Sequence, residues 1–142
     1  MVLLSGGQDS ATCLAWALER YDSVQAICFD YGQRHRVELE CAQGLAKEAQ
    51  INLKILPLDI FSSLTHNALT SSTVPIELEA DGLPNTFVPG RNLIFLTTAA
   101  IAAYQQGCRT LVTGVCQTDY SGYPDCRDGF VTSAQKSISL AL

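Results

Sequence analysis

Residues 1–18 read MVLLSGGQDSATCLAWAL, and this stretch decides the fold class. Met1–Leu4 is a short apolar run that predicts a buried strand. Ser5–Ser10 is a polar turn with two glycines. Apolar residues then return at helical spacing and predict a helix up to Arg20; they are Ala11, Leu14, Ala15 and Leu18. A strand followed at once by a tight turn and a helix is typical of a parallel sheet covered by helices.

The rest of the chain repeats this alternation. Further strands are predicted at Val24–Phe29, Leu53–Leu58 and Thr110–Val115, and further helices at Arg34–Gln50, Leu93–Gln106 and Asp128–Leu142. The second strand is apolar throughout, as expected of an interior parallel strand buried on both faces. We therefore predict an α/β fold with a doubly wound, mostly parallel sheet, helices on both faces, and the first strand beside the fourth.

Two details of this pattern can be checked directly. Within 34–50, the apolar stripe is predicted to comprise four residues spaced four apart, Val37, Cys41, Leu45 and Ala49. Gly107 follows the helix predicted at Leu93–Gln106, at the position where a helix needs a left-handed C-cap. The connection from Asp59 to Arg91 begins with an expected short helix, Asp59–Ala68. Its remainder is expected to be either a functional lid or disordered, because long loops in compact domains are usually one or the other.

Composition narrows the class of protein. The chain has 142 residues, 47% of them apolar, which predicts one domain over 1–142 with a packed core. Nine basic against 14 acidic residues give a net charge of -5, the wrong sign for a protein that grips a nucleic acid. No apolar run approaches the length of a membrane helix, and Met1 is followed by no basic leader region. We expect a cytoplasmic protein.

The turn at Ser5–Ser10 has the composition of an anion-binding loop. Two glycines can adopt positive φ, so backbone N–H groups can converge on one point, and the free N–H groups of the next helix add partial positive charge. Ser5 and Ser10 add hydroxyl donors, and Asp9 could hold a Mg²⁺ ion bound to the same phosphates. The alternative is a helix capped by Ser or Asp after a tight turn. The turn lacks the Walker lysine and the third glycine of a dinucleotide fingerprint.

The same turn resembles the pyrophosphate loop of the N-type ATP pyrophosphatases, or PP-loop superfamily, whose members split ATP to AMP and pyrophosphate. Three further motifs are DYGQRH at 30–35, VPGRN at 88–92 and YPDCR at 123–127. With the loop, they make the chain similar to the QueC/ExsB family of 7-cyano-7-deazaguanine synthases over essentially all its residues. The resemblance implies a Rossmann-like, three-layer fold of the adenine nucleotide alpha hydrolase type.

The resemblance also implies an activity. Such an enzyme activates 7-carboxy-7-deazaguanine with ATP, admits ammonia to form an amide, then activates and dehydrates that amide to a nitrile. The implied cofactors are ATP, Mg²⁺ and Zn²⁺, and the implied assembly is a homodimer. Full family members continue into a segment with four closely spaced zinc-binding cysteines, which these residues lack. We therefore expect a copy truncated before that segment, and we predict no zinc ligands, and no other assigned metal ligands, within 1–142; which acidic residue would bind Mg²⁺ is left open.

The residues of the implied site form three groups. The ATP-binding group is Leu4, Ser5, Gly6, Gly7, Gln8, Asp9, Ser10, Ala11, Thr12 and Phe29. The substrate-binding group is Asp30, Arg34, His35, Asp119, Tyr123 and Asp125. The catalytic group is Asp9, Arg91, Asp125 and Arg127.

The residue types give each group its chemistry. Carboxylates at 119 and 125 can accept the paired N–H groups of a guanine edge, with tyrosines at 120 and 123 for stacking. Arg91 and Arg127 can grip a carboxylate or pyrophosphate. His35 could shuttle a proton from ammonia. The alternatives are a solvated loop for 116–127, core packing for Phe29, a helix cap for Asp30 and a surface position for His35; His66 is expected to be structural or exposed.

The chain has six cysteines, and no two of them form a CxxC pair. Cys13, Cys28, Cys41 and Cys108 are expected to be reduced core thiols because of their apolar surroundings. Cys126 beside Arg127 could be a nucleophile, and Cys116 is a weaker candidate.

Two other functions are weighed against the synthase. One is a tRNA-thiolating or tRNA-amidating PP-loop enzyme, which the acidic charge disfavours. The other is a non-catalytic nucleotide-binding sensor, which the Ser5–Ser10 loop disfavours.

Overall fold

The computed structural model describes residues 1–33, 37–61, 87–117 and 122–142. These residues form two compact units. Unit 1 comprises the described residues of Met1–Asp30, His35–Pro57 and Thr98–Gly114. Unit 2 comprises the described residues of Tyr31–Arg34, Leu58–Thr97 and Val115–Leu142. Among the described residues, no helix is both long enough and apolar enough to cross a membrane.

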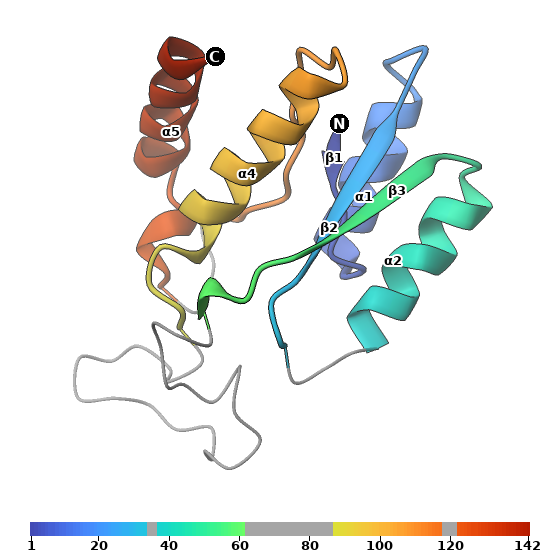
Figure 1. The fold of residues 1–142 in the computed structure, drawn as a ribbon, viewed down its shortest axis with the longest axis horizontal. Coiled ribbons are helices and arrows are strands. Elements are labelled where there is room, and N and C mark those ends of the chain that lie inside the picture. The colour runs from blue at the N-terminus through green and yellow to red at the C-terminus, as the bar shows by residue number, and fades with distance from the viewer. Residues whose placement is uncertain (34–36, 62–86, 118–121) are drawn as a thin grey trace. The chain divides into compact units, whose positions relative to one another are not determined.

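Unit 1 contains a parallel sheet. Its strands are β1 (Val2–Leu3), β2 (Gln25–Asp30) and β3 (Asn52–Pro57), in the order β1-β2-β3. Val2 pairs with Ala26, and Ala26 pairs with Leu53. The central position of β2 agrees with its apolar sequence, since four of its six residues are buried. The three strands, their parallel direction and the interior place of β2 are therefore as the sequence predicts (Figure 1).

The predicted fourth strand is present only as a single bridge. Val112 pairs in parallel with Val2 on the side of β1 away from β2. The Val112 N–H donates to the Met1 carbonyl at 2.9 Å, and the Leu3 N–H donates to the Val112 carbonyl at 2.9 Å. The predicted neighbour of the first strand is thus confirmed. A strand over the whole of Thr110–Val115 is wrong, because β1 is too short to pair with it.

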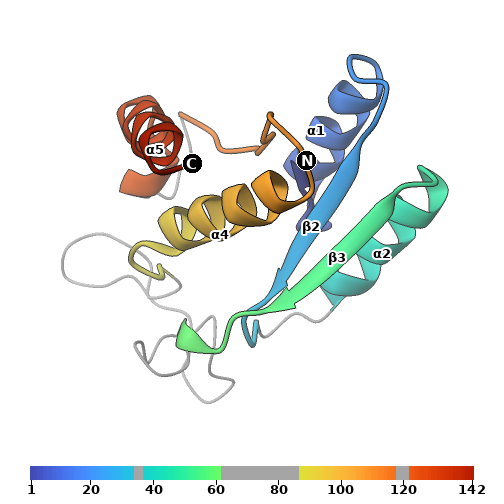
Figure 2. The same cartoon turned by 45° about the horizontal axis from the view of Figure 1, so that its top comes forward.

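Helices cover both faces of the sheet in unit 1. Helices α1 (Gln8–Leu18) and α2 (Val37–Glu48) pack on one face, where Val2, Leu4, Ala26 and Cys28 join Leu14, Ala17, Ala42 and Ala46 in a buried cluster. Ile27 and Phe29 point to the opposite face because side chains alternate along a strand. The C-terminal half of α4 (Arg91–Gln105) lies on that opposite side (Figure 2). The predicted α/β class is therefore confirmed.

The buried stripes of two helices differ from the predicted ones. In α1, Ser10, Leu14 and Ala17 are buried, whereas Ala15 and Leu18 are exposed.

In α2, the prediction of Val37 and Cys41 as buried is wrong, since both are exposed and Ala42 and Ala46 are buried instead. Small residues occupy this face because the α2 backbone approaches the turn at Gly6 closely: a β-carbon there would lie 2.2 Å from the Glu38 carbonyl oxygen.

Two helices end in a Schellman motif. Gly107, at φ +73°, donates its N–H to Tyr104, and Cys108 donates to Ala103, as predicted for this C-cap. The end of α2 repeats the pattern through Gln50, whose φ is 55° although it is not glycine. There Ile51 donates to Ala46 at 3.0 Å. Gln50 therefore carries the backbone strain that glycine avoids at Gly107.

The described part of unit 2 contains a group of aromatic side chains, the first half of α4 and the helices near the end of the chain. Tyr31, Phe61 and Phe95 contact one another, with ring centroids 5.3–5.9 Å apart. The short 3-10 helix η1 (Pro124–Cys126) leads into α5 (Asp128–Ala141), the predicted last helix. Residues 60–61 are helical, but the remainder of the short helix predicted at Asp59–Ala68 lies outside the described residues, as does the rest of the connection to 86.

Candidate active site

The turn after β1 requires glycine at position 6. Gly6 has φ +89°, a conformation that other residues rarely adopt. A β-carbon there would also lie 2.2 Å from the Glu38 carbonyl oxygen and 3.0 Å from the Ala42 nitrogen. Both atoms belong to the backbone of α2, so they cannot rotate away. Gly6 is thus explained by the fold alone.

Gly7 has no such explanation. It is the N-cap of α1, with φ −80° and ψ 166°, which any residue adopts. A β-carbon there would meet only the Ser5 hydroxyl oxygen, at the ordinary contact distance of 3.6 Å. The fold would therefore accept a side chain at position 7, and the glycine keeps the space beside the start of α1 clear.

The first turn of α1 presents backbone N–H groups to this space. Gly7 supplies no side-chain cap, and within the described residues no hydrogen bond is made by the N–H groups of Gln8, Asp9 and Ser10. The Ser10 hydroxyl donates to the Gly7 carbonyl at 2.8 Å, and the Ser5 hydroxyl donates to the Ser10 hydroxyl oxygen at 3.2 Å. The serines thus brace the turn without capping the helix. Three unpaired N–H groups at a helix N-terminus are an arrangement that binds anions in proteins generally, as predicted for this loop.

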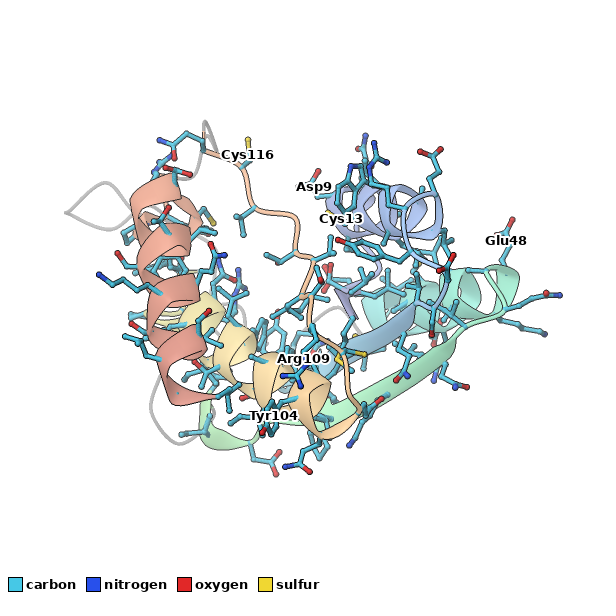
Figure 3. The ribbon with its side chains drawn as sticks, turned by 90° about the horizontal axis from the view of Figure 1, so that it is seen from above. Asp9, Cys13, Glu48, Tyr104, Arg109 and Cys116 are labelled. Carbon is cyan, nitrogen blue, oxygen red and sulfur yellow. The ribbon has the colours of Figure 1, made fainter. Side chains whose placement is uncertain are left out.

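Asp9 lies in the first turn of α1 with its side chain exposed. Cys13 follows one turn later, and Figure 3 shows the two side chains close together on α1. Burial and the charge of Asp9 raise the pKa of the Cys13 thiol. A carboxylate beside an anion site would repel the anion unless a cation lay between them. The role predicted for Asp9, as a ligand of a Mg²⁺ ion, stays a prediction.

Gly114 belongs to this site, although the sequence patterns did not single it out. A β-carbon on Gly114 would lie 3.1 Å from three atoms of Asp9: its carbonyl carbon, carbonyl oxygen and β-carbon. Gly114 thus sets how closely the segment after Val112 approaches the first turn of α1. The available signal was its place, a glycine near the carboxyl end of the predicted fourth strand, where ligand-binding loops of parallel sheets gather.

The remaining predicted site residues of unit 1 lie next to the loop in the sequence or at the end of β2. Asp30 ends β2 at the same edge of the sheet as the loop, because parallel strands share one carboxyl end. Phe29 and Leu4 are buried, at 4% and 1% exposure, and the Leu4 N–H donates to Ile27. Ala11 is half-buried, and the Thr12 hydroxyl donates to the Gln8 carbonyl. Their roles in binding ATP or substrate stay predictions.

In unit 2, the start of α4 is joined to η1. The Asn92 N–H donates to Oδ2 of Asp125 at 3.0 Å. The Asn92 side-chain amide donates to the Asp125 carbonyl at 3.1 Å and contacts the Cys126 sulfur at 3.4 Å. Asp125 and Cys126 are both buried. The predicted acceptor Asp125 thus already binds the N-terminus of a helix through one of its oxygens.

The two predicted arginines and Tyr123 are close neighbours of this contact in the sequence. Arg91 precedes Asn92, and Tyr123 and Arg127 flank η1. The Arg91 guanidinium is 6.0 Å from the centre of the Tyr31 ring, and Tyr123 stacks on Phe87 with ring centroids 5.2 Å apart. Arg127 donates to the Gln117 carbonyl, and the Asp128 N–H donates to the Gln117 side chain. Three predicted residues, Arg34, His35 and Asp119, lie outside the described residues, as do Tyr120 and His66.

Comparison with known proteins identifies the family. The sequence model of a family described as "Queuosine biosynthesis protein QueC" matches residues 1–142. The chain belongs to the QueC family. It is 54% identical to a 7-cyano-7-deazaguanine synthase of Chromobacterium violaceum and 50% identical to those of Burkholderia lata and Burkholderia cenocepacia. These alignments cover 100% of this chain but 62–63% of the length of the curated relatives.

One prediction about the cysteines of this QueC family member is wrong. Cys28 is buried as predicted, and burial raises the pKa of its thiol to about 11. Cys41 is exposed, because α2 turns its alanines toward the sheet. Cys13 and Cys108 are half-buried. Cys116 is exposed, whereas the candidate nucleophile Cys126 is buried.

One cavity formed by described residues lies away from the loop of this QueC family member. It has a volume of about 340 Å³ and is lined by residues that include Val2, Val24, Gln25 and Arg109. Val24 and Gln25 stand at the amino end of β2, whereas Asp30 stands at its carboxyl end. Because ligands of parallel sheets bind at the carboxyl ends of the strands, this cavity is not the predicted site.

Proposed function

We propose that this chain carries the ATP-binding part and a substrate-binding part of a 7-cyano-7-deazaguanine synthase. The reaction joins 7-carboxy-7-deazaguanine and ammonia and ends in 7-cyano-7-deazaguanine, a precursor of queuosine. It is a carbon–nitrogen ligation that releases AMP and pyrophosphate. The family and the names of the curated relatives support this proposal.

The observation that carries the proposal is the contrast between the two glycines of the loop. The fold requires Gly6, whereas nothing around Gly7 requires glycine. An open space that faces three unpaired N–H groups suits a phosphate group. A helix that relied on a side-chain cap would place a Ser, Asp or Asn at position 7, whereas glycine is accepted at an N-cap but leaves the N–H groups uncovered. The open start of α1 therefore supports ATP as ligand over a simple capped helix.

In the proposed mechanism, the chain's own groups bind and stabilise charge. The substrate carboxylate attacks the α-phosphorus of ATP, and pyrophosphate leaves. The N–H groups of Gln8, Asp9 and Ser10 hold the departing pyrophosphate, whose negative charge grows as the bond breaks. Ammonia then displaces AMP to form the amide. The amide oxygen then attacks the α-phosphorus of a second ATP, with release of pyrophosphate and of one proton from the amide nitrogen. Loss of AMP and of the remaining N–H proton leaves the nitrile.

Most of the substrate-facing roles fall to residues of unit 2. Arg91 and Arg127 would bind carboxylate or phosphate oxygens, as planar guanidinium groups do in pairs of hydrogen bonds. Oδ1 of Asp125 would accept an N–H of the deazaguanine ring, and Tyr123 would extend the stack that it forms with Phe87. Asp30, Arg34, His35 and Asp119 complete the proposed set.

The residues of this chain suit one of the two implied metals, Mg²⁺, better than the other, Zn²⁺. Mg²⁺ usually takes one or two carboxylates and completes its shell with phosphates and water, so Asp9 beside the anion site fits it. When bound, the ion neutralises phosphate charge. Zinc needs a group of cysteine or histidine ligands, and the described residues bring together no three His, Cys, Asp or Glu side chains that could hold a metal. We therefore assign zinc no step.

The wider setting is part of the same proposal. A small-molecule substrate, a cytoplasmic location and a homodimer suit a QueC family member. The net charge of -5 supports a small substrate over tRNA. One domain over 1–142 is likewise proposed.

Product analysis tests the function. The purified protein is incubated with ATP, Mg²⁺, ammonia and the deazaguanine acid. AMP, pyrophosphate and the nitrile are expected, and only when all four are present. ADP as product, or AMP formation that requires tRNA, would contradict the synthase. ATP binding without turnover would favour a nucleotide-binding sensor.

A further inference from the structure

The N-terminus of α4 lacks a local cap. Gly90 precedes the helix and has φ +73° and no side chain, so it cannot accept a hydrogen bond from the first turn. Asp125 supplies that acceptor from 33 residues further along the chain, through Oδ2 and the Asn92 N–H at 3.0 Å. The helix dipole favours a carboxylate at this end. One oxygen of Asp125 is therefore committed to α4.

Asn92 returns the contact through its side chain. Its Nδ2 donates to the Asp125 carbonyl at 3.1 Å and contacts the Cys126 sulfur at 3.4 Å. Both partners are buried, Asp125 at 7% and Cys126 at 9% exposure. The side chain of Asn92 thus binds the backbone of η1, and the backbone N–H of Asn92 binds the Asp125 carboxylate. We call this pair of reciprocal contacts between Asn92 and Asp125 the α4–η1 clamp.

The α4–η1 clamp orients the other oxygen of Asp125. Within the described residues, Oδ1 of Asp125 receives no hydrogen bond, and it is not fully buried. It is the oxygen that the proposed function assigns to the substrate. The clamp also connects two arginines with predicted roles, because Arg91 precedes Asn92 and Arg127 follows Cys126. A small rotation of η1 would move Oδ1 and both neighbouring chain segments together.

We propose that Asn92 is a positioning residue for the synthase reaction. It contacts no reacting atom, and it fixes the direction of the Asp125 carboxylate and the spacing of the chain around Arg91 and Arg127. This inference rests on the proposed function. The structure motivates it because a cap alone needs only the backbone N–H of residue 92, whereas the side chain of Asn92 adds two contacts to η1.

Two variants and a control test this role. Asn92→Asp keeps the shape and the backbone N–H, but it removes the amide donor and adds a charge that faces Asp125. Asn92→His restores a nitrogen donor near the position of Nδ2. Thr97→Val is the control, since it removes a side-chain hydrogen bond to Leu93 on the same helix, away from η1. Steady-state kinetics with varied deazaguanine acid and varied ATP are compared with thermal unfolding for all four proteins.

For Asn92→Asp, the KM for the acid should rise about tenfold, the effect of one well-placed hydrogen bond. The KM for ATP should change less than the KM for the acid, because the N–H groups proposed to hold pyrophosphate belong to the loop at Ser5–Ser10 and, within the described residues, make no hydrogen bond with Asn92 or Asp125. Asn92→His should recover at least part of the loss, and Thr97→Val should leave both constants unchanged.

A purely structural role would lower Tm and the active fraction, and leave the KM for the acid unchanged in both Asn92 variants. That result would overturn the inference while the synthase function stands. If Asn92→Asp does not fold, the KM of Asn92→His decides between the two roles. Absence of turnover in the unsubstituted protein would overturn the proposed function and, with it, this inference.

Discussion

The two glycines of the loop allow the requirements of folding and of ATP binding to be separated. Gly6→Ala and Gly7→Ala add the same single methyl group at adjacent positions. The first methyl would collide with the backbone of α2, 2.2 Å from the Glu38 carbonyl oxygen. The second would find only the Ser5 hydroxyl, at 3.6 Å. One substitution should therefore damage the fold and the other the ligand site.

The magnitudes follow from the geometry. At φ +89°, alanine at position 6 costs about 1–2 kcal/mol of backbone strain, and displacing packed α2 backbone adds about 1–3 kcal/mol. Against a typical stability of about 5–15 kcal/mol, Gly6→Ala should be severely destabilised. Gly7→Ala should change the free energy of unfolding by less than about 1 kcal/mol, since φ −80° suits alanine and only its weaker N-cap preference counts.

Urea unfolding and calorimetric titration with ATP and Mg²⁺ measure the two effects on the same protein samples. Gly7→Ala should unfold like the unsubstituted protein but bind ATP at least about tenfold more weakly, a loss of about 1.4 kcal/mol. Unchanged ATP affinity in a stable Gly7→Ala protein would refute the anion site at the start of α1. Unchanged stability of Gly6→Ala would refute the close packing of α2 against the turn.

Three further predictions concern the glycine positions and one thiol. Gln50→Gly should raise the free energy of unfolding by about 1 kcal/mol, because it relieves φ 55° at the end of α2; thermal unfolding measures this, and a lower Tm would contradict it. Gly114→Ala should weaken ATP binding, since its methyl group would press on Asp9 at 3.1 Å. Gly44→Ala, with nothing within 4 Å, is the matched control and should leave ATP affinity unchanged, so equal affinities in both variants would count against a role for Gly114. Burial raises the pKa of the Cys28 thiol from its ordinary value of 9.0 to about 11. The unfolded thiol ionises first, so stability should fall as the pH rises through this window; urea unfolding should show less of this fall in Cys28→Ala, and an identical pH dependence would disprove it.

The strand, turn and helix that carry the candidate loop were predictable because their signals are local. The loop at Ser5–Ser10 follows an apolar run and precedes a helical pattern, and all three features occur within 18 residues. The C-cap at Gly107 is equally local, since it needs one residue with positive φ at the end of a helix.

The helix faces were harder to predict. Val37 and Cys41 follow the hydrophobic period of α2, yet Ala42 and Ala46 face the sheet. Periodicity shows that a helix exists, but two neighbouring stripes of α2 are both apolar enough to be buried. The close approach to Gly6 selects the stripe of small residues, and that approach involves residues more than 30 positions apart in the sequence.

By itself, the sequence determined the parallel α/β class, the strand–loop–helix at the start and the residue types of the proposed site, because short-range spacing and backbone preferences dictate them. Only the tertiary structure distinguished Gly6 from Gly7, brought Gly114 against Asp9 and joined Asn92 to Asp125. Each of these depends on the distance between segments far apart in the chain. Such distances arise from packing, which no local pattern of residues encodes.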